Sequence, residues 1–389
     1  MKKCRVLLLL ALASSLLFAG CGNQPGGSEV LSPSDVIIDE LPESSSVAES
    51  TEEDSSEPES LPTVSGAEIP EGMVASYLSG TAITEELAEL RPITVMFPTD
   101  KGSQPQYHIG DADILYEVME EGNMSRQMGV IHNWHNLEQI GCIRSCRDYY
   151  GYLCMEYDAI MIHWGGPFYL VPLSKTEGYE YLSAVQIGTT DLSAPAIGAG
   201  AFWRPEGEKA TIHNGFTDGP SIKKYAKKAG YSLEHRDDYY YEDRFRFGNV
   251  DLADYDGVID AEKVDLSKVY TTTRTTLQYD EETGKYLKFL YGNAHIDAVS
   301  GEQLSFTNII VQNTKWEYQP DNKYLKFHLV DNTMDGYYIT GGKAIHITWE
   351  KASDFEPTKY YDDNGKEIVL NPGKTFIAIA QEGRNVVFK

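Results

Sequence analysis

Two arginines lie three residues apart in the segment "GCIRSCRDYY", Gly141 to Tyr150, of a 389-residue chain with a formal net charge of −26. A guanidinium group presents a planar fork of N–H donors that fits a carboxylate or a phosphate. Arg144 and Arg147 stand at the start of a predicted helix, where unpaired backbone N–H groups and the helix dipole add positive potential. The pair therefore predicts a binding site for an anionic group.

An internal ion network is the alternative interpretation of the same arginines. Glu117, Glu120 and Glu121 fall in a predicted helix, where positions three or four apart share a face. Arg126 follows one turn later. Three carboxylates and three arginines would neutralise each other in this arrangement. The two interpretations are compatible, because arginines held by glutamates are already oriented to bind an anionic ligand.

Further candidate residues follow the next predicted strand and a long loop. His163 lies at the end of a strand before two glycines, and ligands of open α/β sheets bind beyond the carboxyl ends of strands. A histidine hydrogen-bonded inside the fold is the alternative. The loop "FWRPEGEKATIHNGF" suits a sugar face or an acid, or else packs rigidly on its own aromatics. Its candidate ligand-binding residues are Trp203, Arg204, His213 and Asn214.

Metal and cofactor chemistry is not expected. Cys142, Cys146 and Cys154 are spaced by four and eight, which on a helix places three small apolar side chains on one face. Zinc would need a fourth ligand and closer pairs. Ser221 and Lys224 form an S-x-x-K, but its partner motifs are missing, so the stretch is interpreted as a surface helix. The sequence contains no H-E-x-x-H, Walker loop, G-x-G-x-x-G or G-x-S-x-G.

Strands and helices that would position these residues alternate along the first half of the body. We predict strands at 91–97, 126–134 and 157–166, and helices at 111–122, 147–157 and 221–231, the last closed by Gly230. Beyond about residue 251, short β-rich runs and the Asn364-Gly365 hairpin signal indicate an antiparallel sandwich or open barrel. The predicted fold class is α+β: a mixed α/β domain at 76–254, followed by a β-rich antiparallel domain at 255–389.

The first residues have the pattern of an export signal. Residues 1–20 begin with Lys2, Lys3 and Arg5 and continue with a short apolar run that is too short for a permanent membrane span. The segment "LLFAGC" resembles a bacterial lipoprotein signal, which implies a diacylglycerol on Cys21. An ordinary cleaved signal with an incidental cysteine is the alternative. The expected location is extracytoplasmic, lipid-anchored to the outer face of the cell membrane.

Charge separates a tether from the body. Between Gly22 and Leu90 there are sixteen acidic residues and no Lys, Arg or His, so residues 21–75 are predicted to be an extended, self-repelling tether. From Arg91 onward there are 43 acidic residues against 30 Lys and Arg. This acidic balance excludes nucleic acid as an expected partner, because phosphate backbones demand positive faces.

The body also carries a family resemblance. The segments "RPITVMF", "ADILYEVMEEGNMSR", "GCIRSCRDYYGYLCMEYDAIMIHWGG", "FWR" with "IHNGFT", and "GKAIHITWEKAS" with "YYDDNGKEIVLNPGKTFIAIA" look like the YerB-like lipoproteins. That exported bacterial family has no assigned function. Similar sequences usually read R-S-A-R at the arginine pair, and many have an apolar-Pro step at Cys142. The resemblance implies a two-domain envelope lipoprotein and transfers no catalytic mechanism.

Three functional hypotheses follow. A binding protein would hold an anionic wall fragment, such as a muropeptide or teichoic-acid piece, in a crevice formed by Arg126, Arg144, Arg147 and His163. A wall hydrolase or lyase would use Glu117 or Glu121 as general acid, with His163 as a further catalytic candidate. A partner protein would dock its β-rich domain onto an envelope enzyme.

Overall fold

The described part of the chain begins after the predicted signal and most of the tether. The structure is a computed structural model that describes residues 69–389 apart from 190, 192, 194, 208–210 and 331–333. The signal at 1–20, the lipidation residue Cys21 and the tether up to residue 68 lie outside the described residues. Within the described ranges, no helix combines the length and the apolar character needed to cross a membrane.

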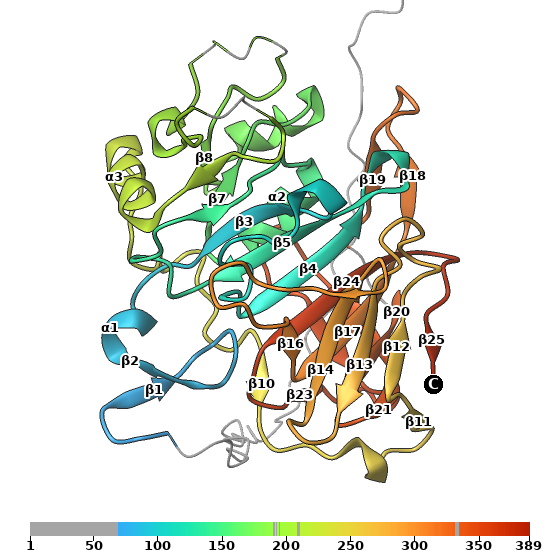
Figure 1. Cartoon of the computed structure of the whole chain (residues 1–389). Helices are drawn as coiled ribbons and strands as arrows, with labels where there is room; N and C mark the ends of the chain where they lie inside the picture. Colours follow the sequence, from blue (N-terminus) through green and yellow to red (C-terminus); the bar gives the residue numbers. More distant parts are fainter. Residues whose placement is uncertain (1–68, 190, 192, 194, 208–210, 331–333) are drawn as a thin grey trace, which may run out of the picture. The chain divides into compact units, whose positions relative to one another are not determined.

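One mixed sheet of 11 strands organises the described body (Figure 1). The sheet contains both antiparallel and parallel pairs, and β24 is parallel to both of its neighbours. In sheet order its strands are β11 (Ile259–Asp260), β21 (Lys343–Glu350), β20 (Met334–Thr340), β17 (Asn308–Thr314), β24 (Thr375–Gln381), β4 (Ile114–Met119), β5 (Ser125–Ile131), β3 (Ile93–Pro98), β7 (Ile160–His163) and β8 (Tyr181–Ser183), with β22 (Lys359–Tyr361) beside β21.

Strand β24, from the end of the chain, joins the two halves of this sheet. Ile377 lies opposite Ile310 of β17 on one side and opposite Tyr116 of β4 on the other. Every residue of β24 is buried, which explains its apolar run "TFIAIAQ". The sheet therefore continues across residue 255, where the sequence pattern changes from mixed to β-rich.

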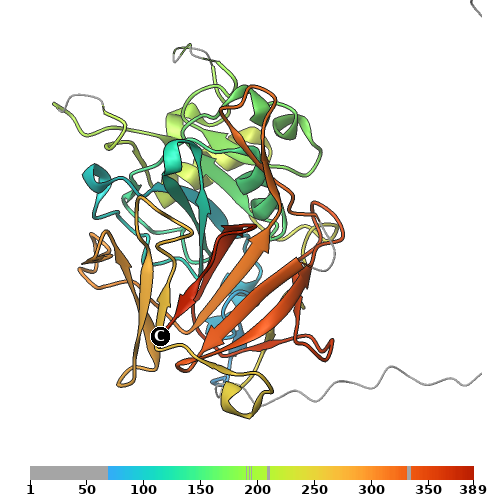
Figure 2. The same ribbon diagram turned by 90° about the vertical axis from the view of Figure 1, so that its right-hand side faces the viewer.

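A second sheet of six strands packs face to face against the first (Figure 2). The ring of Phe306 lies 5.5 Å from that of Phe376 between the two sheets. The Tyr270 hydroxyl donates to the carbonyl oxygens of Glu117, at 2.5 Å, and Ile379, at 3.2 Å. The sequence predicted an antiparallel sandwich or open barrel within the β-rich half, but the larger of the two packed sheets is mixed and also contains strands of the first half. The strands of the second sheet are β12 (Lys263–Asp265), β13 (Thr276–Asp280), β14 (Lys285–Leu290), β15 (Asn293–Ala294), β16 (Ser305–Phe306) and β25 (Val387–Phe388).

Helices lie around the first half of the large sheet. In α2 (Asp148–Met155), the Tyr149 and Tyr150 hydroxyls donate to carbonyl oxygens of β4, Tyr149 to Met119 at 3.1 Å and Tyr150 to Val118 at 3.2 Å. Helix α3 (Gly219–Ala229) ends at Gly230 in the left-handed conformation, as predicted. The remaining elements are α1 (Glu85–Ala88), short 3₁₀ helices that include η1 (Lys101–Ser103) and η2 (Glu121–Asn123), and the strand pairs β1 (Met73–Ala75) with β2 (Ala82–Thr84), β6 (Ile140–Gly141) with β9 (Phe216–Thr217), β10 (Arg246–Phe247) with β23 (Val369–Leu370), and β18 (Trp316–Tyr318) with β19 (Leu325–Phe327).

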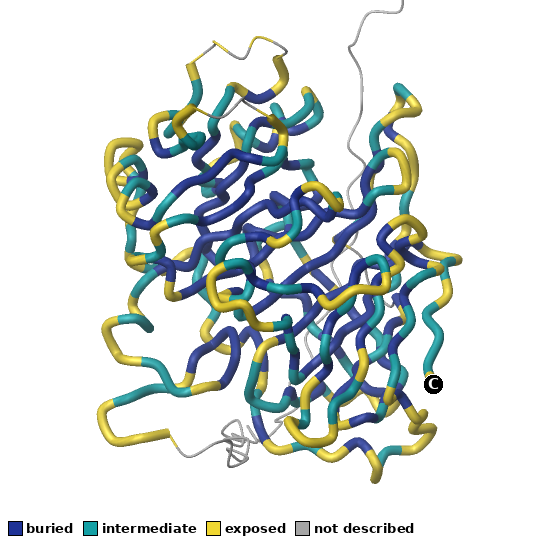
Figure 3. Tube along the Cα trace, viewed as in Figure 1, coloured by how far each residue is buried: buried dark blue, intermediate teal, exposed yellow. Residues whose placement is uncertain are grey.

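The helix predicted at 111–122 is wrong, because Ile114–Met119 form strand β4. Ala112, Leu115, Val118 and Met119 match a helical stripe, but Tyr116 between them is also buried. A strand covered on both faces has a nearly continuous apolar run rather than an alternating one. β4 lies between α2 on one face and the six-stranded sheet on the other, where Glu117 contacts Lys288 of β14, and its trace is buried throughout (Figure 3).

Candidate functional site

The arginine pair lies on an extended segment at the carboxyl ends of β3 and β7. The Arg144 N–H donates to the carbonyl oxygen of Met96 at 2.9 Å, and the Arg144 carbonyl accepts from the N–H of Trp164 at 2.9 Å. One residue beyond Ser145, the N–H of Cys146 donates to the carbonyl oxygen of Gly165 at 2.9 Å. The backbone is therefore fixed between two parallel strands, at the edge where the sequence predicted a ligand.

Two of the three predicted arginines belong to a buried ion network. Nη2 of Arg126 lies 2.8 Å from Oε2 of Glu120, and Nη2 of Arg147 lies 3.5 Å from the same oxygen. Arg147 also contacts Glu121, with Nη2 to Oε2 at 2.7 Å and Nε to Oε1 at 3.2 Å. The arginine side chains are 8% and 11% exposed. Both guanidinium groups are thus engaged with glutamates.

Arg147 connects this ion network to the start of α2. It is the N-cap residue of the helix, and its Nη1 donates to Ser145 Oγ at 3.2 Å and to the Cys146 carbonyl at 3.0 Å. Burial disfavours its charged form, but Glu120 and Glu121 outweigh burial and hold the pKa of Arg147 above its ordinary value. Its guanidinium carbon lies 5.4 Å from the centroid of the Tyr324 ring. Arg147 therefore stays charged and fixed.

Arg144 lies apart from the two glutamates and is the most exposed of the three arginines. Its Nη1 lies 3.0 Å from Oδ2 of Asp100, and the two side chains are 18% and 30% exposed. Burial, with the nearby charge of Arg126, lowers the pKa of Arg144. Asp100 is the N-cap residue of η1, so this pair connects the arginine segment with η1.

A cavity of about 520 Å³ opens beside Asp100, and we call it the Asp100 cavity. The exposed side chains of Lys101 and Arg274 supply two positive charges to its wall. The Lys101 Nζ lies 4.8 Å from the centroid of the Tyr291 ring. Because Arg144 neutralises Asp100, positive charge dominates the cavity. The lining residues are Asp100, Lys101, Met124, Thr271, Thr272, Arg274 and Tyr291.

Sequence reasoning missed the cations of this cavity. Lys101 and Arg274 are 173 positions apart in the sequence. Arg274 occurs in "TTTRTTLQYD", which has the composition of a strand and no binding motif. Its backbone φ of 49° is uncommon for a residue other than glycine, and the sequence gives no sign of it.

A second cavity, of about 470 Å³, adjoins the first and shares Lys101 and Tyr291 with it. We call it the His295 cavity. Its lining combines apolar side chains with a few polar ones. The lining residues are Lys101, Gln104, Pro105, Leu290, Tyr291, Asn293, Ala294, His295 and Ile296.

Glu117, predicted as a general acid beside the arginines, lies on the opposite face of β4. In the β4–β5 register Glu117 is opposite Gln127 and Val118 is opposite Arg126, so Glu117 and Arg126 point to opposite faces of the sheet. The shared helical face on which its role was predicted does not exist. Glu117 is 0% exposed, and its Oε2 lies 3.1 Å from Nζ of Lys288, itself 0% exposed.

Hydroxyl groups complete the surroundings of Glu117. Its Oε1 accepts from Oγ of Ser125 at 2.6 Å and from Oγ1 of Thr275 at 2.7 Å. Burial lowers the pKa of Lys288. The pair is sealed between the two sheets and contributes to structure. The other predicted general acid, Glu121, is held by Arg147 in the network described above.

His163 is also enclosed. It is 0% exposed, and its Nδ1 lies 2.8 Å from the carbonyl oxygen of Gly165. Burial lowers the pKa of His163 to about 4, which keeps the imidazole neutral at physiological pH. His163 is therefore a histidine hydrogen-bonded inside the fold. It is not among the residues that line the Asp100 cavity.

The described residues of the long loop pack partly on the loop's own aromatics and partly on Trp164, and they lie beside η1. The guanidinium carbon of Arg204 lies 4.2 Å from the Trp164 ring centroid, and its Nη1 donates to Oδ1 of Asn214 at 2.7 Å. The Trp203 ring lies 5.3 Å from that of Phe216. His213 borders η1, because a Cβ on Gly102 would come 3.4 Å from its Nε2.

The three cysteines are buried and free, as small apolar side chains would be. Cys142 and Cys146 precede α2, so the three do not share one helical face. Burial raises the pKa of Cys142 to about 11, which makes its thiol a poor nucleophile. In the described ranges, no group of three or more metal-binding side chains comes together.

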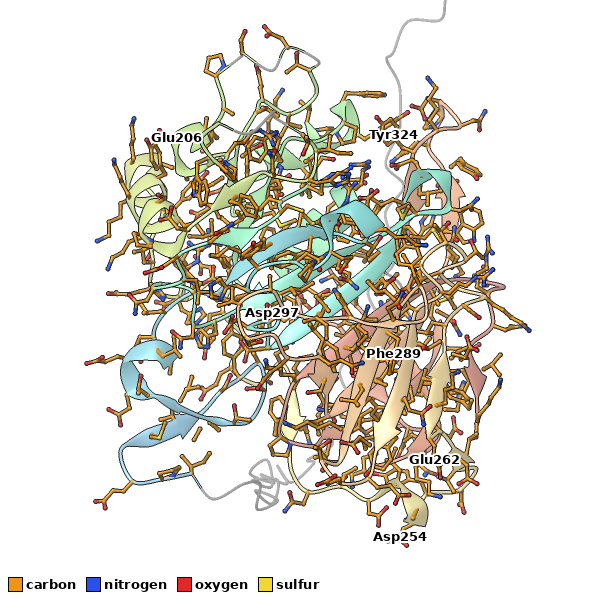
Figure 4. The ribbon with its side chains drawn as sticks, viewed as in Figure 1. Glu206, Asp254, Glu262, Phe289, Asp297 and Tyr324 are labelled. Carbon is orange, nitrogen blue, oxygen red and sulfur yellow. The ribbon has the colours of Figure 1, made fainter. Side chains whose placement is uncertain are left out.

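A third cavity, of about 450 Å³, lies between α2 and the β18–β19 hairpin. The sequence did not predict it. Tyr324, labelled in Figure 4, lies in the turn of this hairpin, and its ring is 5.7 Å from that of Tyr169. Burial raises the pKa of Asp148 in this cavity to about 6. The lining residues are Asp148, Tyr149, Tyr152, Tyr169, Pro172, Glu317, Tyr318, Gln319, Pro320, Lys326 and Phe327.

A two-sheet α+β body with open cavities is thus the class of fold observed. Two family models match the chain, described as the N-terminal domain of a protein of unknown function, DUF3048, at residues 78–232 and the C-terminal domain of DUF3048 at residues 264–377. Together they cover more than half of the chain. The chain belongs to the DUF3048 family.

Known relatives confirm the resemblance to the YerB-like proteins. The chain is 24% identical over 307 residues to "Putative lipoprotein YerB" of Bacillus subtilis (strain 168), which covers 78% of this chain and 86% of the relative. The crystal structure of YerB protein from Bacillus subtilis has a TM-score of 0.64 and 22% identity, with 79% of this chain and 96% of that chain covered. The structural similarity extends the family assignment to the fold.

Proposed function

We propose that the protein is a lipid-anchored extracytoplasmic lipoprotein that binds an anionic cell-envelope fragment, a muropeptide or a piece of wall polymer, in the Asp100 cavity. The name of the Bacillus subtilis relative supports a lipoprotein, and so does the "LLFAGC" segment ending at Cys21. An anchored body with a tether of about fifty residues reaches tens of ångströms into the wall. Its ligands are then polymers of that layer.

The observation that carries the proposal is the pair of exposed cations at an open cavity. Lys101 and Arg274 line about 520 Å³ in a chain whose net charge is −26. In an acidic protein, cations without a nearby carboxylate partner mark a place where an anion is favoured. In the described residues, the one carboxylate in the cavity lining is Asp100, and it faces Arg144.

The rest of the lining suits a polar, sugar-like ligand. Thr271 and Thr272 offer exposed hydroxyl groups, and the half-buried Tyr291 offers a ring face. Charge-assisted hydrogen bonds contribute about 1.5–3 kcal/mol each. Two such contacts, with some ring stacking, correspond to dissociation constants of roughly the millimolar to micromolar range. Such affinities fit a receptor for abundant wall fragments.

A titration of the full-length chain in detergent tests the proposal. Muropeptides from digested peptidoglycan are added at low ionic strength, and the heat of binding and the mass of the recovered muropeptides are measured. We expect saturable binding, weakened about tenfold or more by Arg274→Asn. Asparagine is chosen because it tolerates the left-handed backbone at this position.

Lys227→Gln is the matched control, since it removes one exposed positive charge from α3, far in sequence from the cavity lining. We expect it to bind like the wild type. Equal binding by the wild type and Arg274→Asn would show that the cavity is not the site. Muropeptides recovered with new cleaved masses would overturn the binding proposal in favour of a hydrolase or lyase.

A further inference from the structure

The His295 cavity extends the Asp100 cavity with a different chemistry. Lys101 and Tyr291 form a common wall of the two cavities. Beyond this wall the lining is largely apolar, with Pro105, Leu290 and Ile296. A ligand whose anionic group lies between Lys101 and Arg274 would therefore present its neighbouring substituent to the His295 cavity.

Two buried polar atoms in this lining have no hydrogen-bond partner among the described residues. They are Nδ1 of His295 and Nε2 of Gln104. Buried polar groups in folded proteins are nearly always paired, and an unpaired group loses the hydrogen bond that water would have given. A ligand that supplies both partners would recover these interactions.

The neighbours of His295 determine which of its nitrogens carries the proton. Its Nε2 lies 2.9 Å from Oε1 of Gln106, and Nε2 of Gln106 donates to the carbonyl oxygen of Pro98. The side-chain oxygen of Gln106 therefore faces His295 and accepts a hydrogen bond from its Nε2–H, so the proton is on Nε2. Burial, with the charge of Lys288, lowers the pKa of His295 well below its ordinary value, so the ring is neutral. Nδ1 is then a hydrogen-bond acceptor.

Gln104 provides the complementary group. Its Nε2 is an amide nitrogen that donates hydrogen bonds. A donor on Gln104 and an acceptor on His295 match the carbonyl and N–H of a secondary amide. The apolar side chains of Leu290 and Ile296 suit the methyl group of an acetyl substituent.

We infer that the joined cavities select an N-acylated acidic sugar, with its carboxylate beside Lys101 and Arg274 and its acylamino group at Gln104 and His295. This inference rests on the proposed function and names the ligand class of the same site. A muramic-acid residue that carries no stem peptide has both groups on one ring, because its lactyl carboxylate is free.

Three probes separate the two parts of the claim in titrations of the full-length chain. N-acetylmuramic acid carries both groups, 3-O-carboxyethyl-glucose replaces the acylamino group with a hydroxyl, and N-acetylglucosamine lacks the carboxylate. We expect N-acetylmuramic acid to bind at least about tenfold more tightly than either of the others. Gln104→Met, which keeps the side-chain length, should reduce N-acetylmuramic acid binding to that of 3-O-carboxyethyl-glucose.

Gln278→Met is the control, because it makes the same change at an exposed residue of β13 outside the cavity lining. Equal binding of the two acids by the wild type would overturn the inference and leave the proposed anion binding standing. Binding of neither acid would overturn both. If Gln104→Met unfolds, which its melting temperature would show, the comparison of probes on the wild type still decides.

Discussion

At the scale of single residues, burial divides the charged side chains into structural pairs and accessible cations. Glu117 and Lys288 face each other with 0% exposure, and the hydroxyls of Ser125 and Thr275 complete the surroundings of the carboxylate. Lys101 and Arg274 are exposed at a cavity. The first pair stabilises the packing of two sheets, and the second is available to a ligand.

Removing one partner of the buried pair is expected to be costly. Lys288→Met leaves the Glu117 charge unpaired between the sheets, which should lower the free energy of unfolding by about 3–5 kcal/mol. Adding Glu117→Gln removes that charge and keeps an acceptor for the hydroxyls, so it should recover most of the loss. Urea unfolding of the single and double variants measures both effects.

Lys326→Met is the matched control for this comparison. Lys326 pairs with Glu317 at 2.8 Å, but the two side chains are 45% and 52% exposed. The same substitution should therefore cost less than about 1 kcal/mol. A double variant no more stable than Lys288→Met would contradict the argument from unpaired charge.

Part of the site was predictable at this scale. The sequence placed Arg144 and Arg147 at the start of a helix; Arg147 is the N-cap of α2, whereas Arg144 lies on the extended segment before it. The glutamate network was one of the two interpretations. The cations of the cavity were not predictable, because Lys101 and Arg274 meet only through long-range sheet packing. No local sequence pattern indicates that these two side chains lie close together.

At the scale of elements, β4 and β7 decide which polar groups face the ligand side. A helix at 111–122 would have grouped Glu117 with the arginines, whereas strand β4 sends it to the opposite face. The apolar run of β7 correctly predicted a buried strand, and His163 at its end is enclosed with it. Periodicity identified β7 because its apolar run is short and unbroken, and failed at β4 because apolar residues on both faces imitated a helical stripe.

The burial of His163 predicts a dependence of stability on pH. Its pKa is about 4 in the folded protein against an ordinary value of 6.5. As the pH falls below 6.5, the unfolded chain binds a proton that the folded chain does not, so the free energy of unfolding decreases until the folded pKa is reached. At about pH 5 the loss from this residue is about 2 kcal/mol.

Substitution of His163 tests this dependence. His163→Asn keeps a donor for the Gly165 carbonyl and removes the titrating group. Urea unfolding at about pH 7 and about pH 5 should show a smaller pH effect in the variant, by about 2 kcal/mol. An unchanged pH effect would mean that His163 does not contribute to acid destabilisation.

At the scale of the whole described body, β24 makes one sheet from two halves of the sequence. It pairs with β17 on one side and with β4 on the other. Without this C-terminal strand, the strands of the first half would form a sheet with β4 at an unpaired edge. The change in texture near residue 255 indicated the β-rich region correctly, but composition alone does not reveal that a C-terminal strand inserts beside β4. That pairing depends on a sequence separation of more than 250 residues.

We therefore expect the body to unfold in a single transition. Trp134 and Trp349 are both 0% exposed and report on the two halves, so fluorescence and near-ultraviolet circular dichroism should give the same urea midpoint. A fragment of residues 69–254 would leave β4 as an uncovered apolar edge and should aggregate. Two separated transitions, or a soluble monomeric fragment with cooperative unfolding, would show that the halves fold independently.

The central claim is that the Asp100 cavity receives the anionic group of an envelope fragment. A crystal structure of the full-length chain soaked with N-acetylmuramic acid tests it most directly. We expect the carboxylate between the side chains of Lys101 and Arg274, within hydrogen-bonding distance of the arginine. An empty Asp100 cavity, with the sugar instead on the tyrosines between α2 and the β18–β19 hairpin, would contradict it.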